Sequence, residues 1–154
     1  MSVNKTLSLA VLAACIAAGG PAIPARAGLF SATGQVFAIV AGDLFMGEAE
    51  GHLDGSGTLA IHSQENPALT CAGKFTSSAE SGGKGQMHCT NGITATFDFK
   101  RLTARSGYGT GKLNPGTMSF SYGLSAEKAQ RYLEPPEGKQ LRRNGARLEL
   151  LTSA

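Results

Sequence analysis

Apolar and polar side chains alternate with a period of two between residues 34 and 122. Turn-forming residues interrupt this alternation at a spacing of roughly 8–12 residues, which is typical of consecutive antiparallel strands. The pattern predicts an all-β fold, an antiparallel meander of about eight strands. The expected strands are residues 34–40, 45–53, 57–63, 69–77, 83–89, 93–101, 107–113 and 117–123.

One register rule assigns the faces of these strands. It places odd-numbered side chains from Phe37 to Phe99 on an apolar face, and the parity changes only in the last hairpin. The opposite face is polar, so it meets water, whereas an outer-membrane barrel needs an apolar band outside. The apolar face must then be buried, either in a small barrel or in a sandwich. The polar face carries Glu48, Glu50, His52, Lys74, Lys84, Gln86, His88, Thr94, Thr96, Asp98 and Lys100.

The same rule places a large side chain opposite a glycine in four hairpins. We interpret this as packing of the large side chain over the bare glycine backbone. The alternative is that these glycines mark β-bulges. The expected cross-strand pairs are Phe37–Gly47, Gly51–Leu59, Ala49–Ile61, Phe75–Gly85, Gly85–Phe97, Gly83–Phe99, Leu113–Met118, Gly111–Phe120 and Gly109–Tyr122.

Two cysteines of the expected β domain form an even pair. With a loop over residues 78–82, the register places Cys71 directly opposite Cys89 on the inner face. We therefore predict a buried cross-strand disulfide, which stabilises the fold by about 3 kcal/mol in the chain-entropy model.

Residues 1–27 have the features of a signal peptide. Lys5 precedes an apolar run too short for a mature membrane anchor, and the triplet at 25–27 predicts cleavage after Ala27. The alternative is a lipobox at residues 12–15, which would make the protein a lipoprotein attached through Cys15. Both versions predict export, either to the periplasm or to a membrane surface, with residues 28–154 as a single β domain.

The meander is expected to occupy residues 34–123, and the last part of the chain changes character. Ser125 is expected to cap a helix over residues 126–133, and Asn144-Gly145 predicts a hairpin between residues 139–143 and 146–151. We expect residues 124–154 to form a closing flap that covers one end of the sheet or pairs with its edge. Its apolar residues are Tyr132, Leu133, Leu141, Leu148 and Leu150.

Charge and motifs exclude several functions. Removing Lys5 and Arg26 with the signal lowers the formal net charge from +3 to +1, which argues against a nucleic-acid partner. The sequence contains no Gly-x-Ser-x-Gly elbow, His-Glu-x-x-His motif, phosphate loop or dinucleotide fingerprint. We therefore expect a protein that is not an enzyme and has no cofactor.

Two polar clusters are weak candidate sites. The predicted register places Glu48 opposite His62, a pair that could bind a metal, although a solvated ion pair is commoner on an exposed sheet. Basic residues also gather on the C-terminal hairpin and could contact anionic lipid headgroups or another envelope protein, although such charges usually only solubilise a surface. They are Lys139, Arg142, Arg143 and Arg147.

Three segments carry a resemblance: GDLFMGEAEG at 42–51, GGKGQMHC at 82–89 and YGLSAE at 122–127. Together they resemble an uncharacterised family of small, exported, β-rich proteobacterial proteins. The resemblance covers most of the mature chain and implies a location in the cell envelope. It carries over no catalytic or binding residue.

These observations favour a non-enzymatic structural or binding module of the cell envelope. A second hypothesis is a small barrel that binds an apolar ligand in space left by its glycines, which requires an interior cavity of a few hundred Å³. A third is a metal-dependent hydrolase that uses the Glu48/His62 face.

Overall fold

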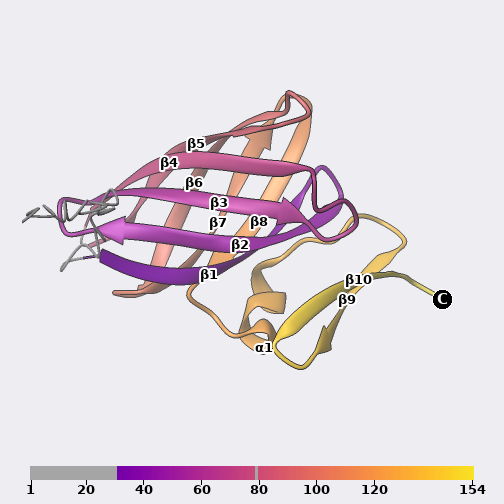
Figure 1. Ribbon diagram of the computed structural model, residues 1–154. Coiled ribbons are helices and arrows are strands. Elements are labelled where there is room, and N and C mark those ends of the chain that lie inside the picture. Colours follow the sequence, from indigo (N-terminus) through magenta and orange to yellow (C-terminus); the bar gives the residue numbers. More distant parts are fainter. Residues whose placement is uncertain (1–30, 79) are drawn as a thin grey trace, which may run out of the picture.

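The computed structural model describes residues 31–78 and 80–154. Eight of its strands form a closed antiparallel barrel in chain order, with β1 paired to β8 (Figure 1), so the barrel alternative holds over the sandwich. The predicted signal peptide, the cleavage site after Ala27 and Cys15 lie outside the described residues. The barrel strands are β1 (Ser31–Val40), β2 (Asp43–His52), β3 (Ser56–Ser63), β4 (Thr70–Ser78), β5 (Gly82–Cys89), β6 (Thr94–Thr103), β7 (Ser106–Leu113) and β8 (Gly116–Tyr122).

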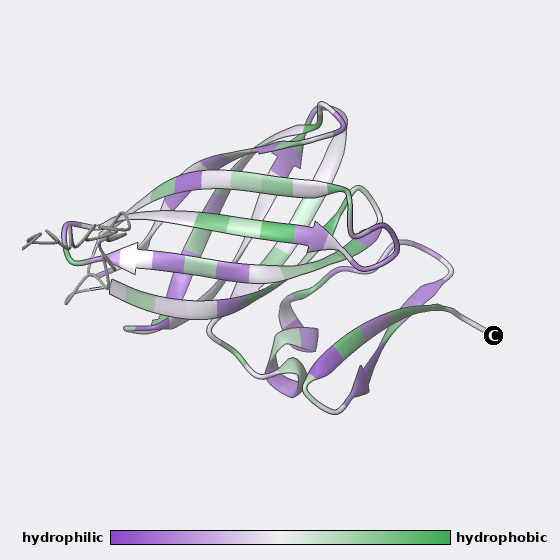
Figure 2. Ribbon diagram, in the orientation of Figure 1, coloured by the Kyte–Doolittle hydropathy of each residue, from purple (hydrophilic) through white to green (hydrophobic). Residues whose placement is uncertain are grey.

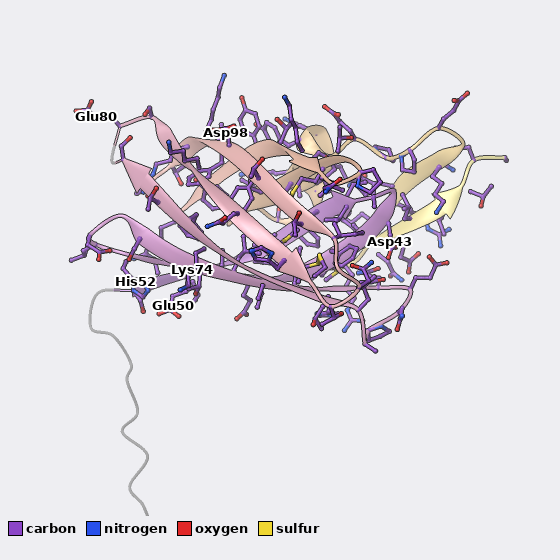
Figure 3. All side chains as sticks on the ribbon, turned by 90° about the horizontal axis from the view of Figure 1, so that it is seen from above. Asp43, Glu50, His52, Lys74, Glu80 and Asp98 are labelled. Carbon is purple, nitrogen blue, oxygen red and sulfur yellow. A yellow bond between two sulfur atoms is a disulfide. The ribbon has the colours of Figure 1, made fainter. Side chains whose placement is uncertain are left out.

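The outer wall of the barrel is polar, as predicted. Glu48, Lys84 and Asp98 are exposed, and hydrophilic and hydrophobic residues alternate along the strands in Figure 2. Figure 3 shows Lys74 and Asp98 pointing away from the barrel. No helix among the described residues is both long and apolar enough to cross a membrane.

Aromatic rings fill much of the barrel interior. Phe75 and Phe99 meet edge to face with ring centres 5.6 Å apart, and Phe99 meets Tyr122 in the same way. Phe97 and Phe120 form a third such pair at 5.3 Å. These are favourable arrangements for aromatic side chains. Aliphatic residues such as Leu59 and Met87 complete this inner core.

The glycines of the barrel wall make room for these rings, which confirms the packing interpretation. Gly85 lies opposite both Phe75 and Phe97, as predicted. A Cβ atom at Gly85 would lie 2.7 Å from a ring carbon of Phe97 and 2.5 Å from the backbone oxygen of Lys74. A Cβ atom at Gly109 would similarly lie 2.6 Å from a ring carbon of Phe120. A larger residue at either position would therefore collide with the inner core.

The β4–β5 hairpin has the predicted register, including the disulfide. Cys71 lies opposite Cys89, and the two residues are bonded with their Cα atoms 3.9 Å apart. Cys71 is buried, and Cys89 is partly buried. The bond therefore joins β4 to β5 across the inner face of the barrel.

The predicted register of the first hairpin is wrong by one residue. Val36, and not Phe37, lies opposite Gly47, because the loop contains only Ala41 and Gly42. Both loop residues have positive φ angles, 51° and 81°, as a type I′ turn requires. The expected strands, 34–40 and 45–53, left a longer loop between them. Because a one-residue slip turns a strand over, Phe37 points away from the barrel interior.

Two further hairpins are displaced by two residues from the predicted register. Gly51 lies opposite Gly57 instead of Leu59, and Leu113 lies opposite Gly116 instead of Met118. A two-residue shift leaves each side chain on its predicted face. Leu53 is the exception, because it lies in the turn before β3 and is 80% exposed. The affected pairs become Ala49–Leu59, Gly47–Ile61, Gly111–Met118, Gly109–Phe120 and Gly107–Tyr122.

The C-terminal segment, residues 124–154, forms a short helix and a hairpin. The predicted helix is divided into α1 (Ala126–Ala129) and the 3₁₀ helix η1 (Gln130–Tyr132), and Ser125 caps α1 as expected. Strands β9 (Lys139–Asn144) and β10 (Arg147–Thr152) form the hairpin. Asn144 pairs with Arg147, so the loop is one residue later than predicted.

The C-terminal segment covers the outer face of β1 and β2 near one end of the barrel (Figure 1). Two arrangements were expected, a cover over the sheet or a strand paired with its edge. The second is wrong, because β9 and β10 form a separate two-stranded sheet. Tyr132 stacks on Tyr108 of β7 with ring centres 4.3 Å apart. We call the apolar cluster between the C-terminal segment and strands β1 and β2 the outer core. It contains Phe37, Ile39, Leu44, Ala126, Ala129, Leu133 and Leu148, with Met46, Leu124, Leu141 and Leu150 packed against it.

Candidate functional site at the open end of the barrel

The structure does not pair the two residues of the candidate metal site. Glu48 lies opposite Ala60, and His62 lies opposite Met46, because the register differs by two residues from the predicted one. Both side chains are exposed. Within the described part of the chain, no three His, Cys, Asp or Glu residues are grouped closely enough to hold a metal ion.

Ion pairs neutralise part of the basic cluster on the C-terminal hairpin. Arg142 pairs with Glu149 at 2.9 Å, and Arg143 pairs with Glu127 of α1 at 3.3 Å. Hydrogen bonds from Asn144 and Arg142 lower the pKa of the Glu149 carboxyl. The cluster is therefore a mixed-charge surface that also links the hairpin to the helix, and it is less suited to binding anions than the sequence alone predicts.

The two ends of the barrel are built differently. One end lies beside the C-terminal segment, and there Asp43 accepts a hydrogen bond from the fully buried Ser63. In the described part of the chain, the other end, which we call the open end, is where β2, β4 and β6 end and β3, β5 and β7 begin (left in Figure 1). A cavity of about 70 Å³ lies inside the barrel at the open end.

Gly51 supplies much of the free space in this cavity. A Cβ atom at Gly51 would have one ring carbon of Phe75 within reach, at 4.0 Å, and would collide with nothing. The same atom at Gly57 or Gly83 would clash with a phenyl ring or with backbone. The floor of the cavity is apolar, and Leu59 and Phe99 contribute to it.

A polar lip lies over this apolar floor. Arg101 of β6 donates a hydrogen bond to the Ser77 hydroxyl at 2.9 Å and a longer one to the Ala104 carbonyl at 3.5 Å. No carboxylate of the described residues forms an ion pair with Arg101. Tyr122 also lines the cavity. Burial raises the pKa of its hydroxyl, and the charge of Arg101 partly opposes this shift.

The open end also carries exposed apolar side chains. Leu53, in the turn before β3, is 80% exposed, and Leu102, near the end of β6, is 45% exposed. Among the described residues, these two are the exposed large hydrophobic side chains. The open end therefore combines an apolar cavity with a cationic lip, whereas Leu53 and Leu102 lie outside the cavity lining.

The cavity is smaller than the interior-ligand hypothesis requires. That hypothesis needs a few hundred Å³ left by the glycines, whereas the rings of Phe97, Phe99 and Phe120 occupy most of that space. A hollow of about 650 Å³ does exist on the outer wall, with Ala60 and Ala72 among its lining residues. Both alanines are exposed, so this hollow is open to water and offers little desolvation to a ligand.

The sequence contains one signal for this site. The odd-number rule ended at Phe99, yet one further step along β6 places Arg101 on the inner face, and the same rule places Ser77 there. An arginine at an inward position of an otherwise apolar strand face is unusual, because a buried charge needs a partner. Only the closed barrel, however, brings Arg101, Ser77 and Tyr122 around one cavity.

No family model matches the chain, and the searches of curated proteins and of solved structures give no significant match either.

Proposed function

We propose that this protein is an exported, non-enzymatic binding module of the cell envelope, and that its ligand site is the open end of the barrel. The observation that carries the proposal is the apolar cavity beside Gly51 beneath the Arg101 lip. Binding sites combine an apolar lining with a few convergent polar groups; this cavity has both, at a volume below that of a typical ligand pocket. The described lining residues include the hydroxyls of Ser77 and Tyr122, but no His, Asp, Glu or Cys that could act on them as a general base.

The size of the cavity limits what enters it. An engineered apolar cavity of about 150 Å³ holds benzene, and the volume here is about 70 Å³. The ligand therefore buries a short apolar group and leaves its remainder outside the cavity.

Two observations support export. The disulfide between Cys71 and Cys89 is of a kind that persists in oxidising compartments such as the periplasm. The N-terminal 27 residues have the composition of a signal peptide. Intact mass spectrometry of protein from the envelope fraction tests this step, with Gly28 expected as the first residue. A diacylglyceryl adduct on Cys15 would instead establish lipid attachment, and an uncleaved chain in the cytoplasm would refute export.

Binding can be tested with 1-butanol as a small apolar probe. We expect amide NMR shifts of the mature protein, residues 28–154, to concentrate around Gly51, Phe75 and Phe99. Gly51→Leu should fill the cavity and abolish these shifts, because a side chain at this position meets open space. Ala72→Leu places the same side chain on the exposed outer wall and should leave them unchanged. Shifts that persist in Gly51→Leu, or that map to the outer wall, would contradict the proposed site.

A further inference from the structure

We infer that the open end recognises a small monocarboxylate with an apolar tail, whose carboxylate pairs with Arg101. This inference rests on the proposed binding function and specifies the ligand class. The apolar tail occupies the cavity beside Gly51, and the carboxylate stays at the lip.

The hydrogen bonding of Arg101 leaves it able to bind an anion. A guanidinium has five N–H donors, and Arg101 uses only two contacts, to Ser77 and Ala104, both with neutral acceptors. No ion pair with a described carboxylate compensates its charge. A half-buried, unpaired cation over an apolar floor is unfavourable by itself, and an anionic ligand would relieve that cost.

Tyr122 provides a second donor on the same cavity. Its ring packs edge to face against Phe99, which fixes the hydroxyl near the lip. The hydroxyl is protonated at neutral pH and can donate a hydrogen bond, and burial raises its pKa further above its ordinary value. Arg101 and Tyr122 thus place two sets of hydrogen-bond donors on one cavity.

The charge of the site favours a monoanion. Arg101 is the one charged residue among the described residues that line the cavity. The nearby Arg105 is exposed and does not contribute to the lining. A dianionic phosphate group would leave one negative charge without a partner, whereas a carboxylate matches both the charge and the planar fork of the guanidinium.

The test compares butanoate with 1-butanol, which have the same carbon chain and differ in the charged group. NMR titration of the mature protein should give at least about tenfold tighter binding of butanoate, the size expected for hydrogen bonds to a charged group. Arg101→Ala should abolish this preference, so that both probes bind equally, and Arg101→Lys should retain part of it. Arg105→Ala, which removes an exposed arginine at the same end, should leave the preference unchanged.

The outcomes separate this inference from the proposed function. Equal binding of butanoate and 1-butanol would overturn the inference and leave the binding function intact. Binding of neither probe to the wild-type protein would overturn both. A preference for butanoate that survives in Arg101→Ala, or disappears in Arg105→Ala, would assign recognition to the general charge of this end and refute pairing with Arg101. Circular dichroism of each variant establishes that it is folded, and Arg101→Lys keeps the test valid if Arg101→Ala unfolds.

Discussion

The inner core of the barrel and the outer core beneath the C-terminal segment bury apolar residues in different ways. The inner core draws alternate residues from all eight barrel strands and packs rings against glycines. The outer core joins a local C-terminal segment to three residues of β1 and β2, namely Phe37, Ile39 and Leu44. Strand β1 belongs to both cores, so its residues 36–40 are buried without interruption. Closing the barrel buries only one face of β1, and the C-terminal segment buries the apolar residues on its other face.

Polar groups also distinguish the two cores. Ser119 and Ser121 of β8 are both buried. The hydroxyl of Ser119 accepts a hydrogen bond from the Glu134 backbone at 2.8 Å, whereas the hydroxyl of Ser121, opposite Phe37, has no hydrogen-bond partner in the described structure. The outer core thus buries a polar group at a cost, and the inner core achieves close packing by omitting side chains.

The largest effect is expected from Leu148→Ala in the outer core. Leu148 is 0% exposed, so truncation leaves a cavity among Phe37 and its neighbours and should lower the free energy of unfolding by about 2–5 kcal/mol. Urea unfolding followed by circular dichroism measures this change. Leu53→Ala is the control, because Leu53 is 80% exposed and its truncation should alter stability by less than about 0.5 kcal/mol. Similar values for both variants would show that the outer core adds little.

The inner core can be tested by one substitution at two glycines. Gly85→Val should lower the free energy of unfolding by about 1–3 kcal/mol, because the added methyl groups collide with Phe97 and with the backbone of β4. Gly51→Val should have a much smaller effect, because its side chain enters the cavity. Thermal unfolding of both variants gives the comparison. Equal destabilisation would contradict the role of ring packing at Gly85, because valine has the higher strand propensity at both positions.

The smallest effect is expected from Ser121→Ala. Removing a buried hydroxyl without a hydrogen-bond partner should raise the free energy of unfolding by up to about 1 kcal/mol. Ser119→Ala removes a hydroxyl that accepts a hydrogen bond, so it should lower stability by about the same amount. Denaturant unfolding of both variants shows whether each substitution raises or lowers the free energy of unfolding. A destabilised Ser121→Ala variant would show that this hydroxyl has a partner, such as a bound water.

Local patterns in the sequence determined much of this protein. Period-two alternation separated a wet face from a dry one over β2 to β6, and turn residues located the strands to within a few positions. The register between β4 and β6 followed from the same rule and placed Cys71 opposite Cys89. Such features are readable because strand geometry couples neighbouring residues along the chain and across short turns.

Tertiary structure decided the rest. Apolar residues on both faces of β1 left its orientation open, and the two-residue turn at Ala41-Gly42 and the covering C-terminal segment resolved it. Closure of β1 onto β8 converted a sheet into a barrel and gathered Ser77, Arg101 and Tyr122, from three different strands, around one cavity. No short-range pattern encodes such a meeting, because it depends on the curvature and closure of the whole sheet.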